Sequence, residues 1–371
     1  MKPLNPFLYL KYNFKSVLPI FFSLTIGVLF IYFFALFSAT THKMIRLVSF
    51  DVMEKINIVY TDDNTFLPDS LLKKINSVEG SNPIAVQMNL SGLAYYSGGM
   101  GGTTMLTLNL FDDDVPALLD SCKIKLVDGT LPKNNSFEIL VPLEYALQNN
   151  LSVGDYIGTA VSDECSLQGK YSICGLTSGN VVFSVSCQPG NKSKEEIMNR
   201  GILYGVDSLS SAKQKNLLNN LPDNTVAITY DYYEQEYAIT LNSMKLLTYI
   251  LTATMIVILC IALGNLNVIL FANRRDEFTI LHLIGFTKWK ICRKIWIENL
   301  FICMGGYLMG IILTQIAAWA FNIIILSPQG KTLELISLNG ILAALSMPVF
   351  VSIFSLLPCL INDSRYIETE Y

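Results

Sequence analysis

Apolar residues along the chain are concentrated in four uncharged runs, each bounded by charged segments. The runs lie between Lys15 and His42, between Lys245 and Arg274, from Asn299 to Gly330, and from Leu335 to Asn362. A helix needs roughly 20 apolar residues to cross the hydrocarbon core of a bilayer, and every run is longer than that. The pattern therefore predicts a polytopic membrane protein with four transmembrane α-helices.

Composition supports this class, because 51% of the 371 residues are hydrophobic and only 15% are charged. A soluble domain has roughly 25% charged residues. The first run could instead be a cleaved signal peptide, since "FSAT" near its end resembles a cleavage site. Its apolar stretch exceeds the roughly 7–15 residues of a signal-peptide core, so we expect it to be retained as an anchor.

The long segment between the first two runs has sequence patterns of both strands and short helices. "INIVYT" alternates as a strand does, and "PDSLLKKINSVEG" is typical of a short helix that ends at a glycine. The segment predicts an α+β domain inserted between spans 1 and 2. The junctions "THKMIRLVSFDVMEKI" and "YDYYEQEYAITLNSMK" lack Gly and Pro, so we expect helices that extend the spans outward as stalks. Packed juxtamembrane helices are the alternative.

The distribution of Lys and Arg predicts the orientation in the membrane. Lys2, Lys11 and Lys15 precede the first run, and six Lys or Arg follow the second, whereas residues 42–245 carry 23 acids against 15 bases. Basic loops stay in the cytoplasm, so both termini are expected on the cytoplasmic side of the cell membrane and residues 42–245 outside. The predicted segments are a cytoplasmic stub with span 1 (1–41), the outer domain (42–245), span 2 (246–273), a cytoplasmic loop (274–298), span 3 (299–330), a short external connection (331–334), span 4 (335–362) and a cytoplasmic tail (363–371).

Four of the eight cysteines fall in the predicted outer domain, where disulfides can form. Cys165 and Cys174 flank "SLQGKYSI", a plausible hairpin, and are the candidate pair. Free buried thiols are the equally open alternative.

The residues that carry most enzymatic chemistry are sparse. The two histidines, His42 and His282, lie on opposite sides of the predicted membrane, so they assemble no hydrolytic triad or His-based metal site. "GKT" at 330–332 lacks the first glycine of a phosphate-binding loop, because that position is Ile325. We therefore expect a non-catalytic chain without a cofactor or metal of its own, and nothing indicates nucleic-acid binding.

The cytoplasmic loop, residues 274–298, is the most patterned candidate site. A first helix is expected to end at Gly285, and a second helix leading into span 3 is expected from Thr287, with Trp289 on its apolar side. A basic amphipathic helix on anionic lipid would explain the lysines and tryptophans. It would not explain the need for two helices around a glycine, which favours a docking element for a cytoplasmic protein.

The stretch "RRDEFTILHLIGFTKWKICRKIWIEN", followed by "GGYLMG", resembles the signature of the MacB/FtsX-type permeases of bacterial ABC transporters. In the outer domain, "LVDGTLPKNNSFEILVPLEYALQNNLSVGDYI" is similar to a conserved passage of that family. The resemblance implies that a separate ATPase docks on the loop. The residues implied in docking are Arg274, Arg275, Glu277, Gly285, Phe286, Lys288, Trp289 and Glu298.

The resemblance further implies that ATP and Mg bind to the partner ATPase, in two copies, and that two permease chains assemble as a homo- or heterodimer. ATP-driven pairing of the ATPases would then move the outer domains through the stalks. The expected function is export or extraction of a peptide or lipid-linked substrate. A transmitter that moves no substrate and controls an extracellular enzyme or sensor partner is the alternative.

Overall fold

The computed structural model describes residues 14–61, 65–77, 81–88, 92–96, 101–162, 165–205, 218, 221–222 and 224–354. These residues divide into two compact units. The helical unit contains residues 14–39, 243–321 and 334–354 of the described chain. The mixed unit contains Thr40–Asn242 and Asn322–Leu333.

Among the described residues, the helical unit contains α2 (Phe14–Ile45), α9 (Tyr230–Ala272), α10 (Arg275–Leu283), α11 (Lys288–Phe321) and α12 (Leu338–Phe354). In the part of the chain that the structure describes, three helical stretches are long and apolar enough to cross a membrane, namely Val17–Met53, Tyr230–Ala262 and Trp289–Gln329. Helix α12 is apolar but shorter, and the rest of the fourth run lies outside the described residues. Both junctions predicted to be helical are helical, since α2 continues into η1 (Arg46–Phe50) and α3 (Asp51–Met53) and α9 begins at Tyr230.

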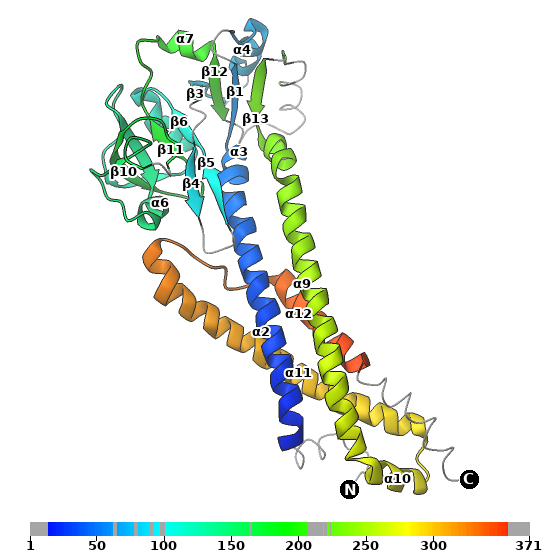
Figure 1. Cartoon of the computed structure of the whole chain (residues 1–371). Coiled ribbons are helices and arrows are strands. Elements are labelled where there is room, and N and C mark those ends of the chain that lie inside the picture. Colours follow the sequence, from blue (N-terminus) through cyan, green and yellow to red (C-terminus); the bar gives the residue numbers. More distant parts are fainter. Residues whose placement is uncertain are drawn as a thin grey trace. The chain divides into compact units, whose positions relative to one another are not determined.

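Small residues bring α2 and α11 close together in the helical unit (Figure 1). A Cβ on Gly306 would lie 3.0 Å from Leu24, and one on Gly310 would lie 2.7 Å from Val28. Hydrogen bonds across the two helices add to this packing, including 2.8 Å from Gln315 Nε2 to Tyr32 Oη. Small residues and polar cross-links are the usual means of helix association in a membrane.

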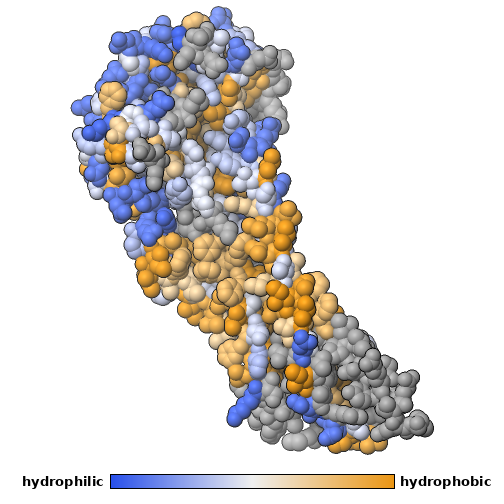
Figure 2. Space-filling view, in the orientation of Figure 1, coloured by the Kyte–Doolittle hydropathy of each residue, from blue (hydrophilic) through white to orange (hydrophobic). Residues whose placement is uncertain are grey.

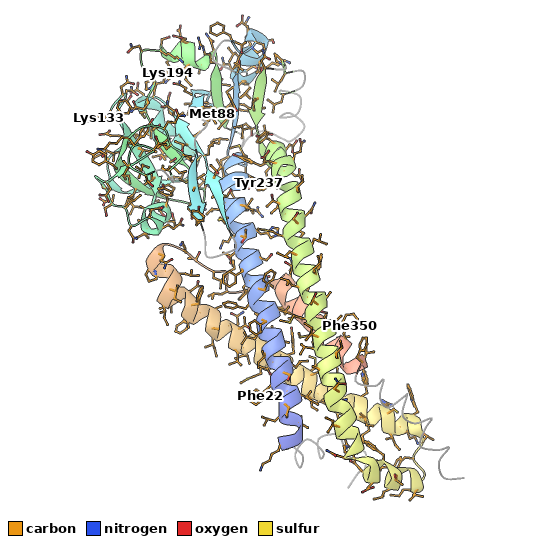
Figure 3. The ribbon with its side chains drawn as sticks, viewed as in Figure 1. Phe22, Met88, Lys133, Lys194, Tyr237 and Phe350 are labelled. Atoms are coloured by element: carbon orange, nitrogen blue, oxygen red, sulfur yellow. The ribbon has the colours of Figure 1, made fainter. Side chains whose placement is uncertain are left out.

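The outer faces of these helices are apolar. Figure 2 shows hydrophobic side chains over the helical unit, and Figure 3 labels two exposed examples, Phe22 on α2 and Phe350 on α12. Helix α9 exposes most of its apolar window, because only 11% of that window is buried. Such a surface needs lipid or protein to cover it.

The described residues of the mixed unit form three sheets. The first is antiparallel, in the order β13-β1-β12-β2. The second has the order β3-β6-β11-β8-β10-β7, with β9 paired to β10, and the third is the hairpin β4–β5. The strands are β1 (Ile56–Thr61), β2 (Ile84–Ala85), β3 (Gln87–Met88), β4 (Leu93–Tyr96), β5 (Gly102–Met105), β6 (Thr107–Asn109), β7 (Lys125–Gly129), β8 (Glu138–Pro142), β9 (Tyr156–Ile157), β10 (Tyr171–Ser178), β11 (Ser184–Ser186), β12 (Gly201–Gly205) and β13 (Thr225–Ile228).

Short helices cover these sheets: α4 (Asp69–Asn76), η2 (Asp112–Asp114), α5 (Val115–Ser121), α6 (Leu143–Gln148) and α7 (Lys194–Met198). Alternating side chains of β8 enter two different cores. Leu140 packs with the cluster around Leu108 and Leu118, whereas Ile139 and Val141 pack with a second cluster on the other face. The period of two along a strand produces this separation.

The second cluster joins the sheet to helical segments of the same unit. Ile45 and Val48 belong to it, and Tyr233 and Tyr237 of α9 pack against it. The ring of Phe50 lies 5.1 Å from that of Tyr230 and 6.2 Å from that of Tyr237, between centroids. The helical ends that enter the mixed unit are therefore part of its core.

Cys165 and Cys174 do not form the candidate disulfide, because both are free thiols. Cys174 lies in the first core cluster, whereas Cys165 packs against the second. The two side chains therefore approach the large sheet from opposite faces. Burial, with a smaller effect of the Glu138 charge, raises the pKa of Cys174 to about 12.

Candidate functional site: the 274–298 corner

Residues 274–298, which we call the corner, fold as two helices around a glycine. Helix α10 ends at Leu283, and Phe286 N donates to Leu281 O at 3.1 Å to close its last turn. Gly285 has a φ of +95°, in the left-handed region that glycine adopts most easily. The sequence prediction of a helix stop at Gly285 is therefore correct, and α11 begins three residues later.

Four charged side chains connect the two helices. Arg274 donates to Glu277 through Nε (2.8 Å) and Nη2 (3.0 Å), and to Glu298 through Nη1 (2.8 Å). Lys294 Nζ donates to Glu277 Oε1 at 2.6 Å and lies 3.7 Å from Glu298 Oε1. Two cations thus alternate with two anions in a closed ring, which fixes the start of α10 against α11.

The ring is largely buried, so its geometry matters energetically. Glu298 is 1% exposed, and Lys294 is also buried. Glu298 Oε1 accepts no hydrogen bond from the described residues. The guanidinium carbon of Arg274 also lies 4.9 Å from the Phe278 ring centroid, within the range of a cation–π contact. Removing one member of a buried ion pair typically destabilises a protein because it leaves the other charge without compensation.

Opposing effects set the pKa of Glu277. Burial is the largest single effect and would raise the pKa, but hydrogen bonds and charges from Arg274 and Lys294 together lower it below its ordinary 4.5. Glu277 is therefore ionised at neutral pH. Asp276 and Glu277 also lie in the first turn of α10, where negative charge favours a helix.

A small apolar core lies between the helices. Leu281, Ile291 and Ile295 are buried there, and Phe278 and Phe286 pack against them. Phe286 thus helps to hold the two helices of the corner together.

The tip of the corner exposes large apolar side chains. Leu283 is 80% exposed, Ile284 is 66% exposed and Trp289 is 75% exposed. They lie within four residues on either side of Gly285. Isolated exposed hydrophobic residues are ordinary, but a group of this size at one turn is typical of a contact surface.

The structure separates the predicted docking residues into two groups. Arg274, Glu277 and Glu298 form the ring, whereas Trp289 is exposed at the tip. The side chains of Arg275, Lys288 and His282 lie outside the described residues. Sequence reasoning missed Lys294 as a ring member and Leu283 and Ile284 as tip residues. The spacing of Lys294 and Glu298, four apart on one helix, was the available signal for the first.

Within the described residues, no group of three or more His, Cys, Asp or Glu side chains could hold a metal ion. The ring itself has its donors and acceptors largely paired with one another. Its arrangement is suited to rigidity.

Comparison with known proteins places the corner in a recognised domain. Residues 249–361 match the model of the family described as "FtsX-like permease C-terminal". This part of the chain is similar to the C-terminal domain of FtsX-like permeases. This match confirms the resemblance to FtsX-type permeases, and it spans the end of α9, the whole corner, α11 and α12. An FtsX-like permease is a membrane protein, which agrees with the apolar helices.

Among solved structures, the chain is similar to a crystal structure of a domain from Porphyromonas gingivalis that is described as a permease. The identity is 15% and the TM-score is 0.26, over 45% of this chain and 82% of the other. None of the curated proteins matches the chain.

Proposed function

We propose that the chain is the permease subunit of a bacterial ABC transporter whose separate cytoplasmic ATPase docks on the corner. The observation that carries the proposal is the apolar tip of Leu283, Ile284 and Trp289 on a corner braced by a buried ion ring. A docking element that transmits force needs both an adhesive surface and a rigid support. The tip supplies the first and the ring supplies the second.

In this proposal the chain crosses the membrane four times, with both termini in the cytoplasm and the mixed unit outside. ATP and Mg bind to the ATPase, present in two copies, and this chain performs no catalysis. A second permease chain completes the assembly. ATP binding favours one of two conformations, because it pairs the ATPases and displaces both corners. The movement extracts or exports a peptide or lipid-linked substrate.

The docking step is tested by placing a charge on the tip. Leu283→Glu and Ile284→Glu should each reduce recovery of the ATPase in co-purification by more than about tenfold, which corresponds to roughly 1.4 kcal/mol. Ile239→Glu is the matched control, since Ile239 is 78% exposed on α9 within the mixed unit. Recovery of the ATPase by both tip variants at the level of the control would refute docking at the corner.

Transport is tested separately, in vesicles that contain the chain and its ATPase. ATP-dependent movement of substrate supports export or extraction. ATP-dependent control of an outer partner without substrate movement would replace transport by signal transmission, while docking would stand.

A further inference from the structure

The segment between α11 and α12, residues 322–333, belongs to the mixed unit although the helices on either side belong to the helical unit. We call it the outer link; it contains η3 (Asn322–Leu326) and η4 (Ser327–Gln329). The Asn322 side chain ties its two ends together. Nδ2 donates to Leu333 O and Oδ1 accepts from Leu333 N, both at 2.8 Å. The outer link is therefore a closed loop with a defined shape.

The backbone of the outer link lies directly against α6. Gly330 has a φ of +63°, and a Cβ at this position would lie 2.6 Å from Leu147 Cβ and 2.8 Å from Glu144 O. Real Cβ atoms essentially never come so near, so a larger residue must push the outer link away from α6. Glycine at 330 thus permits a contact that no other residue type could make without displacement.

Gln148, the last residue of α6, connects the outer link to the β4–β5 hairpin. Its Nε2 donates to Gly330 O at 3.5 Å, and its Oε1 accepts from Tyr96 N at 3.2 Å. Burial, as the largest effect, raises the pKa of the nearby Tyr95 to about 12, against a smaller lowering effect of Gln148. One amide side chain thereby joins two segments far apart in the sequence.

The hairpin in turn contacts both helical entries to the mixed unit. The hydroxyl oxygen of Thr103 forms a hydrogen bond of 2.9 Å with that of Tyr237, which is labelled in Figure 3. Leu93 and Met105 pack in the same cluster as Val48. A continuous series of contacts therefore runs from the outer link through α6 and the hairpin to the ends of α2 and α9, all inside the mixed unit.

We propose that the outer link is a third attachment through which the mixed unit receives motion, with Gly330 and Gln148 as its positioning residues. The proposal rests on the proposed function. Helix α11 has 34 residues, starts at the corner with Lys288 and ends at Phe321, immediately before the outer link. A displacement of the corner therefore reaches α6 along one unbroken helix, in addition to the two stalks.

The test compares Gly330→Ala with Gly190→Ala in the full chain with its ATPase. Gly190 has nearly the same φ, +65°, but nothing lies within 4 Å of its Cβ position, so both variants strain the backbone and only one displaces a neighbour. The readout is hydrogen exchange of the amides in α6 and the hairpin, with and without ATP. We expect Gly330→Ala to keep the ATPase bound and to reduce the ATP-dependent change by at least about fivefold, the lower range of coupling between sites. Gly190→Ala should respond as the unmodified chain does.

Gln148→Leu is the second variant, since it removes both hydrogen bonds of the side chain without backbone strain. It should reduce the ATP-dependent change in the same direction. If the unmodified chain responds and all three variants respond equally, the third attachment is refuted while the proposed function stands. If the unmodified chain does not recover the ATPase, the proposed function fails instead.

Discussion

The buried carboxylate of Glu298 offers the sharpest test of the corner's rigidity. Glu298→Gln keeps the size of the side chain and an acceptor for the Arg274 hydrogen bond of 2.8 Å. It removes one of two negative charges from a ring with two positive charges. The new amide NH₂ would also occupy the place of an oxygen that lies 3.7 Å from Lys294 Nζ, so two donors would face each other.

The expected cost follows from burial. A charged hydrogen bond contributes about 1.5–3 kcal/mol, and removing one partner from a buried ion pair costs about 3–5 kcal/mol. Because Glu277 remains to pair with both Arg274 and Lys294, we place the cost of Glu298→Gln at about 2–3 kcal/mol. Local opening of α10 should then increase by about 30- to 160-fold, at roughly 1.36 kcal/mol per factor of ten.

Hydrogen exchange of the α10 amides in detergent measures this opening directly. Glu196→Gln is the matched control, because Glu196 pairs with Arg200 at 3.5 Å and its side chain is 42% exposed. A surface pair contributes only about 0–1 kcal/mol, so the control should leave exchange in its own helix nearly unchanged. If Glu298→Gln accelerated exchange no more than the control does, the argument that the ring braces the corner would be refuted.

Three further predictions follow from the same structure. Because the pKa of Glu277 is lowered, its stabilising contribution should be present above pH 4.5 and lost as the pH falls below 4.5; thermal unfolding between pH 6 and pH 3.5 should show this loss, and Glu277→Gln should flatten it. Cys165 should alkylate before Cys174, whose thiol is buried with a pKa of about 12, and peptide mass spectrometry should find no disulfide between them. Gly310→Ala should destabilise the helical unit by about 1–3 kcal/mol through overpacking against α2. Gly264→Ala, with no atom near its Cβ position, should cause no such loss of stability, and thermal unfolding in detergent distinguishes the two variants.

The helices and the glycine stop were predictable because they depend on local sequence and on the membrane. Uncharged length specifies a spanning helix, and Gly285 ends α10 since its φ of +95° favours glycine. The ion ring was not predictable, because Arg274 and Glu298 are 24 residues apart and meet only through the angle between α10 and α11. The pattern of apolar residues along the sequence does not predict the angle between the two helices.

The cysteines illustrate a different limit. A simple alternation along β10 cannot say which face Cys174 occupies, because the pairing of β10 with β8 shifts register between Ile173 and Gly175. A bulge of this kind redirects side chains without a clear sequence signal. The outer link shows a third limit: residues 322–330 are uncharged and resemble part of a span, but they belong to the mixed unit. Absence of charge alone therefore does not show where a predicted span ends.

The structure also bears on whether the corner meets lipid or protein. A helix that lies on a bilayer needs an apolar face along its length. Helix α10 has nine residues, and its apolar side chains Phe278 and Leu281 are already packed against Ile291 and Ile295 of α11. The apolar side chains that remain exposed are Ile280 and the tip residues Leu283, Ile284 and Trp289. A compact apolar tip fits a pocket on a folded partner better than an extended bilayer surface, and this is why the ATPase is the occupant we propose.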